Sequence, residues 1–270
     1  MKTRIITAAV LVPLLFVFLI VLPIPCTVVM FGVIGAIGAY EMLVSTGIVK
    51  NIRLAIYAAA MAFCLPLWCY YGMNYALALG GILVYAFLIF GELMLSKAKL
   101  PLRTVGLTFL SGTLLPFLLC AVVRIHSGVN GRMLVFIPFI AAYMSDSGAY
   151  FVGCFWGKTK LAPVISPQKT VEGALGGVAS AVISMMIYCL ILQFGFGLQV
   201  NYLYGLIYGV SGALAGMFGD LCFSAIKRQT GIKDYGNIFP GHGGVLDRFD
   251  SVIVVAPLIE LLLQIIPMAV

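Results

Sequence analysis

The chain has 270 residues, of which 63% are hydrophobic and only 9% are charged. A soluble protein would carry about a quarter charged residues, so this composition excludes an ordinary soluble domain and indicates an integral membrane protein. The net charge of +7 does not indicate nucleic-acid binding, because the cations of a membrane protein set its orientation and attract anionic lipid.

Long apolar runs recur along the whole chain. A transmembrane helix needs roughly 20 predominantly apolar residues, and in lipid each span must satisfy its own backbone hydrogen bonds. The runs lack the alternation of barrel strands, so the predicted fold is all-α, a polytopic membrane protein with about nine transmembrane helices. The predicted spans are approximately 5–22, 26–46, 54–71, 75–95, 104–125, 133–152, 174–194, 201–223 and 251–268.

The first half of the chain, 1–130, is predicted to consist of apolar helices with short loops. Its first run has the basic start of a signal peptide, but the apolar stretch is long and no Ala-x-Ala-like site follows, so we expect an uncleaved first helix. Glu41 and Glu92 are the only acids of this half. Each lies near a cytoplasmic helix end, where snorkelling or a basic partner is a simpler explanation than catalysis.

Positive charge is distributed unevenly between the predicted loops. With nine spans, the N-terminus and the even-numbered loops share one side, which holds all of the 16 lysines and arginines except Arg124 and Arg132. The positive-inside rule places this side in the cytoplasm. We therefore expect a multi-pass protein of a bacterial-type cytoplasmic (inner) membrane, with its N-terminus inside, its C-terminus outside and its active site facing the cytoplasm.

The polar residues gather in the second half of the chain. We expect one integral membrane domain over 1–270, with a catalytic half, 131–270, that contains two cytoplasmic loops, 153–173 and 224–250. The spans between these loops are joined on the far side, so the two loops are predicted to meet on the cytoplasmic face.

Asp220 lies in an apolar setting near the cytoplasmic end of the span 201–223. Intramembrane acids are costly and usually face an interior cavity with a partner. Ser224 and Lys227 follow at i+4 and i+7, so the three side chains share one helix face that leads into the polar loop. The alternative is an Asp–Lys pair that only orders the loop.

The Gly-His-Gly-Gly sequence at 241–244 can present backbone N–H groups to an anion, although such a tetrapeptide on its own is usually a turn. Asp247, Arg248 and Asp250 follow at once, and the two acids at i and i+3 can face one site. Asp220 and Asp247 would then supply carboxylates from two helices, which suits a Mg²⁺ ion bridging to phosphates.

A second polar segment begins at Asp146 and ends at the span 174–194. Ser166, Thr170 and Glu172 form a plausible helix start, so the two hydroxyl side chains are either substrate contacts or simple caps. Lys169 is placed to reach a phosphate or a lipid headgroup.

The run from Ser224 to Asp250, S-x-x-K-R-x₄-K-D-x-G-x₄-G-H-G-G-x₂-D-R-x-D, resembles that of the phosphatidate cytidylyltransferases (CDP-diacylglycerol synthases) at every fixed position. The segment 146–173 is similar to a second region of that family, D-x-x-A-Y-x-x-G…G-K…S-P-x-K-T-x-E-G. It departs from the family pattern at Cys154, where a basic residue is expected, and at Gln168, where lysine or asparagine is common. The first half resembles the family only in hydropathy and topology.

The resemblance implies a membrane enzyme that joins CTP and phosphatidic acid into CDP-diacylglycerol and pyrophosphate with Mg²⁺, alone or with a second cation. Its partners would be these two substrates and membrane lipids, without nucleic acid, in a monomer or a homodimer. The residues predicted to act are Asp220, Lys227, Arg228, Asp247 and Arg248 in catalysis, Asp220 and Asp247 as metal ligands, and Asp146, Ser166, Lys169, Thr170, Glu172, Ser224, Lys233, Asp234, His242, Gly243, Gly244 and Asp250 in substrate binding.

The phosphate of phosphatidate loses its second proton near pH 6, so at pH 7 much of it is a dianion that can attack CTP without a general base. His242 is accordingly expected to hold the loop by hydrogen bonds and not to act as a base. Two other functions stay open. A CTP-dependent polyprenol or phytol kinase would match the 224–250 pattern only loosely, and a cation-coupled transporter would place its acids near the midplane, often in repeated, broken helices.

Overall fold

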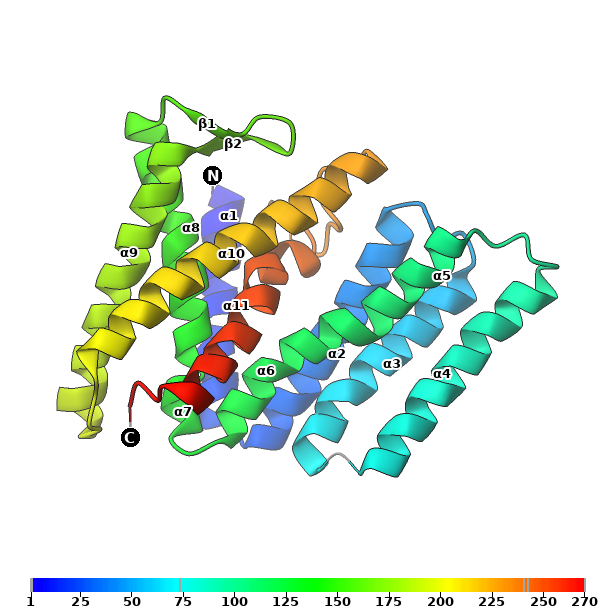
Figure 1. Cartoon of the computed structure of the whole chain (residues 1–270), viewed down its shortest axis with the longest axis horizontal. Helices are drawn as coiled ribbons and strands as arrows, with labels where there is room; N and C mark the ends of the chain where they lie inside the picture. The colour runs from blue at the N-terminus through cyan, green and yellow to red at the C-terminus, as the bar shows by residue number, and fades with distance from the viewer. Residues whose placement is uncertain (1, 73, 240, 242, 270) are drawn as a thin grey trace. The chain divides into compact units, whose positions relative to one another are not determined.

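The computed structural model describes residues 2–72, 74–239, 241 and 243–269, and its elements are shown in Figure 1. The α-helices are α1 (Lys2–Phe16), α2 (Ile24–Ser45), α3 (Ile52–Tyr71), α4 (Tyr75–Leu95), α5 (Leu102–Phe109), α6 (Leu115–Ser127), α7 (Gly131–Leu134), α8 (Phe136–Trp156), α9 (Val171–Leu190), α10 (Tyr202–Thr230) and α11 (Leu246–Ile265). Short π-helical segments continue or connect some of them, namely η1 (Val17–Val21), η2 (Leu110–Leu114) and η3 (Ile191–Gly195). Two strands, β1 (Lys160–Ala162) and β2 (Ser166–Thr170), form a hairpin.

The all-α, polytopic prediction is confirmed, since a helix occupies each of the predicted spans. In the described part of the chain, seven helical stretches are long and apolar enough to cross a membrane. The remaining two predicted spans correspond to α1 with η1, whose apolar stretch is shorter, and to α11, which begins Leu-Asp-Arg-Phe-Asp. A multi-pass membrane protein is therefore established, and the count of nine spans stays a prediction.

The chain folds into two compact units. The first comprises Met1–Ser127 and Gln229–Phe249, and the second comprises Gly128–Arg228 and Asp250–Val270. The polar connection between α10 and α11, together with the first turn of α11, thus belongs with the N-terminal helices. The N-terminal half is therefore more than a membrane anchor, because it carries part of the segment in which the sequence concentrates its charge.

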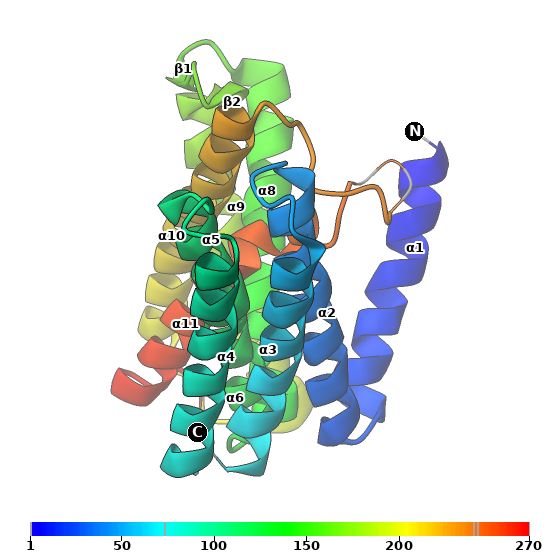
Figure 2. The same ribbon diagram turned by 90° about the vertical axis from the view of Figure 1, so that its right-hand side faces the viewer.

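In the first unit, α2 packs along α3, and α6 packs against both; Figures 1 and 2 both show α2 and α3 side by side. A Cβ added to Gly32 would lie 3.0 Å from the Phe63 ring and its carbonyl oxygen, and one on Gly35 would lie 3.3 Å from the Ala62 oxygen. Lipid offers no hydrophobic drive for helix association, so small residues that permit close backbone approach hold such pairs together.

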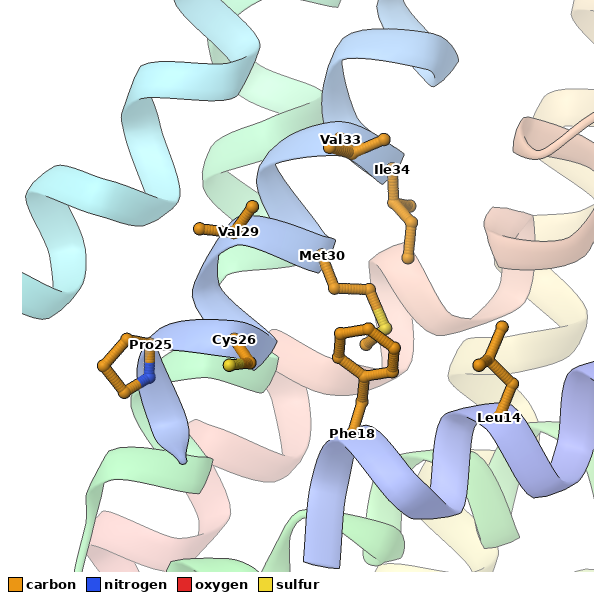
Figure 3. A pocket seen from close by; sticks show the side chains of 8 residues that line it. All are labelled: Leu14, Phe18, Pro25, Cys26, Val29, Met30, Val33 and Ile34. Atoms are coloured by element: carbon orange, nitrogen blue, oxygen red, sulfur yellow. The ribbon is translucent and has the colours of Figure 1, made fainter. Parts of the chain in front are cut away.

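A pocket of about 570 Å³ lies between the first two apolar segments. In Figure 3, Leu14 and Phe18 point toward Met30 and Ile34 of α2. The other lining residues are Pro25, Cys26, Val29 and Val33. A lining of hydrocarbon and sulfur-containing side chains has no means of binding a phosphate, so the phosphate chemistry predicted from the sequence must lie elsewhere.

In the second unit, α8 packs along α9, and the β1–β2 hairpin lies beyond their ends (Figure 1). The strands are antiparallel, with Lys160 opposite Thr170 and Ala162 opposite Ser166. The hairpin corrects the prediction of a loop over 153–173. The strands are only three and five residues long, Lys-Leu-Ala and Ser-Pro-Gln-Lys-Thr. Neither alternates apolar and polar residues over four or more positions, so they give no strand signal.

The predicted loop 224–250 is shorter in the structure, because α10 continues to Thr230 and α11 begins at Leu246. Lys227 and Arg228 therefore lie on the last turn of α10. Both are good helix formers, and cations interact favourably with the negative end of the helix dipole. The helix thereby carries Asp220, Ser224 and Lys227 on one face, as the i, i+4, i+7 spacing predicts.

The C-terminal part of α10 lies close to the main chain of α11. A Cβ on Gly219 would lie 2.8 Å from the Asp250 carbonyl oxygen and 3.0 Å from a Val254 methyl group. Only glycine fits there without a shift of either helix. This contact fixes the neighbouring Asp220 at the point where α11 enters the second unit.

Candidate functional site

Asp220 is the centre of a polar group in the second unit. The Lys169 ammonium nitrogen lies 2.5 Å from Asp220 Oδ2, and the Ser224 hydroxyl donates to Asp220 Oδ1 over 3.1 Å. The two charged side chains are 24% and 26% exposed, so both remain accessible to a ligand. The structure thus brings three predicted residues together, and the lysine that lies 2.5 Å from the acid comes from β2.

Two further carboxylates lie near this group. Asp250 is buried, accepts a 2.8 Å hydrogen bond from the Ser251 amide, and lies within electrostatic reach of Asp220, Asp146 and Lys227. The Ser251 hydroxyl donates to Asp146 Oδ2 over 3.3 Å. Helices α8, α10 and α11 therefore each direct an acid into one region of the second unit, and such a concentration of negative charge calls for cations.

Two predicted substrate-binding residues at the end of the hairpin, Thr170 and Glu172, make contacts that stabilise the local structure. Thr170 caps α9, since its hydroxyl oxygen accepts the Gly173 amide over 3.1 Å. Glu172 accepts from the amides of Lys158 and Thr159, each over 3.1 Å. The capping alternative is confirmed for Thr170, and Glu172 has a structural contact that the sequence analysis did not predict.

Arg228 and Ser166 are the other predicted residues that contact the hairpin or belong to it. Arg228 Nε donates to the Ile165 carbonyl over 3.1 Å, which links the end of α10 to the turn of the hairpin. Ser166 is half-buried at the start of β2. Their contacts with substrate stay predictions.

In the first unit, Asp247 organises the Gly-rich connection. Its Oδ2 accepts the amides of Tyr235 over 2.7 Å and Gly244 over 3.0 Å, and only 6% of the residue is exposed. Gly243 adopts φ +84°, a conformation that favours glycine. Asp247 thus holds the loop closed on the first turn of α11, and its predicted role as a metal ligand stays a prediction.

Lys233, Asp234 and Arg248 are exposed in the same segment, whereas Gly244 is buried. Lys233 and Arg248 therefore present positive charge to the surface of this unit. His242, which is predicted to hold the loop by hydrogen bonds, lies outside the described residues.

Glu41 makes contacts that were not predicted from the sequence. It is 3% exposed, and its two carboxylate oxygens accept the amides of Val245 over 3.0 Å and Leu246 over 2.8 Å. The basic-partner explanation is confirmed for Glu92, which Arg53 contacts at 3.4 Å. For Glu41, the contacts that the structure shows are backbone amides more than 200 residues away in sequence. The only signal available was that an acid in an apolar helix must be satisfied by some partner.

No group of three or more His, Cys, Asp or Glu side chains comes within reach of one ion in the part of the chain that the structure describes. The predicted pair of ligands, Asp220 and Asp247, belongs to two different units. Metal binding is therefore an expectation from donor chemistry, to be tested residue by residue.

A comparison with known families assigns the chain to a family. The model of the cytidylyltransferase family matches residues 2–266, nearly the whole chain. The chain belongs to the cytidylyltransferase family. For this cytidylyltransferase-family protein, the polar residues of both units therefore lie within the matched stretch.

Individual relatives agree with this assignment. The chain is 30% identical over 265 residues to a phosphatidate cytidylyltransferase of Staphylococcus epidermidis, a match that covers 97% of this chain and 99% of the relative. It is 46% identical over 133 residues to the Bacillus subtilis protein of the same name (49% of this chain, 48% of the relative) and 42% identical over 134 residues to that of Staphylococcus saprophyticus (50% of each). The matches to the latter two span about half the length of those relatives.

Proposed function

We propose that this cytidylyltransferase-family protein transfers CMP from CTP to phosphatidic acid, which gives CDP-diacylglycerol and pyrophosphate at a bacterial-type cytoplasmic membrane. The observation that carries the proposal is the match to a relative of that name along nearly the whole of both chains. The gathering of acids and lysines around Asp220, which lies on the membrane-type helix α10, supports it.

In the proposed reaction, an oxygen of the phosphatidate phosphate bonds to the α-phosphorus of CTP. The bond from that phosphorus to the bridging oxygen of the β-phosphate breaks, and pyrophosphate leaves with the electron pair. The attacking oxygen needs no base once its phosphate is a dianion. Catalysis must then position two anions in line and neutralise their charge, and preorganised cations do both.

The residues suit these tasks in different ways. Lys169 and Lys227 lie on the side of Asp220 and Asp250 and would compensate phosphate charge there. Lys233 and Arg248 are exposed in the other unit and would meet the nucleotide from water. Gly243 and Gly244 would offer backbone N–H groups to a phosphate, although the Gly244 amide already donates to Asp247.

The carboxylates fit a magnesium ion by their chemistry, because Mg²⁺ prefers oxygen ligands and is commonly bound by one or two carboxylates together with substrate phosphates. Asp220 would be the principal ligand, since its side chain is 26% exposed, and Asp247 is the second ligand predicted from the sequence. When bound, the ion would neutralise phosphate charge and stabilise the leaving pyrophosphate.

The purified protein in detergent tests the proposal with phosphatidate, Mg²⁺ and CTP that carries its label in the α- or the γ-phosphate. We expect label in the lipid only from the α-labelled nucleotide, together with release of pyrophosphate. Transfer of the γ-label would instead identify a CTP-dependent lipid kinase. No transfer from either nucleotide would refute both functions.

A further inference from the structure

The Glu41 carboxylate is enclosed by the segment that joins α10 to α11. Val245 and Leu246, whose amides it accepts, are 4% and 3% exposed, so these N–H groups have no access to bulk water. They stand at the start of α11, where the first amides have no partner within the helix and where negative charge is favourable. Glu41, on α2, therefore accepts the hydrogen bonds of two N–H groups at the start of α11 that have no acceptor within that helix.

Two glycines of the same segment pack directly on this carboxylate. A Cβ on Gly244 would lie 2.5 Å from each Glu41 carboxylate oxygen, and one on Gly236 would meet Glu41 Oε1. Gly244 does not adopt a positive φ, so its backbone conformation does not require glycine. Glycine is required there because the Glu41 carboxylate leaves no room for a side chain.

The contact continues one turn further along α2. The Ser45 hydroxyl donates to the Tyr235 carbonyl, and the Tyr235 amide donates to Asp247. Glu41 and Ser45 are i, i+4 neighbours and share one face of α2. The end of α2 thus holds the connection at both ends, near Tyr235 and near Val245.

We propose that Glu41 is a positioning residue for the proposed cytidylyl transfer. It anchors the connection 231–245 to α2, so that the exposed Lys233 and Arg248 and the backbone of Gly243 meet the nucleotide in one fixed arrangement. The inference rests on the proposed function for its catalytic consequence, but the anchoring itself is independent of that function.

Glu92 provides a matched control. It is also a buried acid of the first unit, 8% exposed, but its partners are side chains of the α3 region: Asn51 Nδ2 at 2.8 Å and Arg53 at 3.4 Å. The change Glu92→Gln removes the same charge without touching the connection 231–245.

The first test measures hydrogen exchange of the full-length protein in detergent. Glutamine at position 41 keeps one acceptor oxygen but turns an NH₂ group toward a backbone donor, so one buried amide loses its partner. We expect Glu41→Gln to speed exchange at Val245 and Leu246 by about tenfold or more, and Glu92→Gln to leave these amides at the wild-type rate. Equal protection in both variants would overturn the anchoring, whether or not the protein transfers CMP.

The second test measures the rate per folded molecule, with the folded fraction taken from size-exclusion chromatography. We expect Glu41→Gln to lower kcat by about tenfold or more, because a loosened loop no longer holds its groups in line, whereas Glu92→Gln keeps the wild-type kcat. A purely structural role would lower the yield of folded protein and leave kcat unchanged, which would overturn the positioning role.

A double-mutant cycle tests the contact itself. Gly244→Ala should lower kcat in the wild-type background because its methyl group meets the Glu41 carboxylate, and should have little further effect in Glu41→Ala, where that carboxylate is gone. Fully additive losses would refute the contact. An inactive wild type with altered exchange in Glu41→Gln would instead reject the proposed function and retain the anchoring.

Discussion

The change Asp220→Asn tests the centre of the candidate site most directly. It keeps the shape of the side chain and an oxygen that can accept from Ser224, but it removes the negative charge that faces Lys169 at 2.5 Å. About a quarter of each charged side chain is exposed, so solvent screening limits the lost ion pair to about 1 kcal/mol of stability. The folded protein should therefore survive the substitution.

The expected loss in rate is much larger than the loss in stability. Removal of a ligand that holds Mg²⁺ on the phosphates should cost several kcal/mol of transition-state stabilisation, and about 3 kcal/mol corresponds to roughly a hundredfold in rate. We expect the same size of loss for Asp247→Asn, in which the loop contacts to Tyr235 and Gly244 also weaken.

The assay is transfer of α-labelled CMP to phosphatidate at saturating Mg²⁺, with Glu92→Gln as the variant that loses a paired acid elsewhere. Glu92→Gln should match Asp220→Asn in thermal stability to within about 1 kcal/mol and retain the wild-type rate. If either aspartate variant keeps more than about a tenth of the wild-type rate, its loss is too small for a metal ligand and that assignment is wrong.

Three further predictions concern the topology, the general base and the helix contact. Reporter fusions at the two ends of the chain should place the N-terminus in the cytoplasm and the C-terminus outside; both ends on one side would mean an even number of spans. His242→Gln should lower kcat by about tenfold with the rise in rate through about pH 6 retained, while Lys227→Ala and Arg248→Ala should lose far more; a folded but inactive His242 variant without that pH dependence would make the histidine the base. Gly219→Ala should lower the free energy of unfolding by about 1–3 kcal/mol through overpacking against α11, and an unchanged thermal midpoint would contradict the close contact.

Local features were predictable from the sequence. The span 75–95 coincides with α4, because an apolar run bounded by polar residues determines a membrane helix almost by itself. The Thr170 cap was recognised as an alternative because capping depends on residues three apart. The common face of Asp220 and Ser224 follows from helical spacing alone, and their hydrogen bond is present.

Features that depend on distant parts of the chain were not predictable. The partners of Glu41 come from the other end of the sequence, and nothing near Glu41 indicates which backbone amides it accepts. The contact of Lys169 with Asp220 depends on where the hairpin returns, which no local pattern indicates. A strand of three residues such as β1 is formed by its partner and not by its own composition.

The length of α10 has a consequence for where the two reactants can meet. Its 29 residues extend about 43 Å at a rise of about 1.5 Å per residue, whereas the hydrocarbon layer is about 30 Å thick. Asp220 lies eighteen residues from Tyr202, the first residue of the helix, or about 27 Å along it. A helix that starts at the far edge of the hydrocarbon and runs straight across it would thus place Asp220 about 3 Å inside the near edge, just below the phospholipid headgroups, and would carry Lys227 and Arg228 beyond that edge. The single helix α10 would then reach both the lipid reactant, which stays in the bilayer, and the nucleotide, which stays in water.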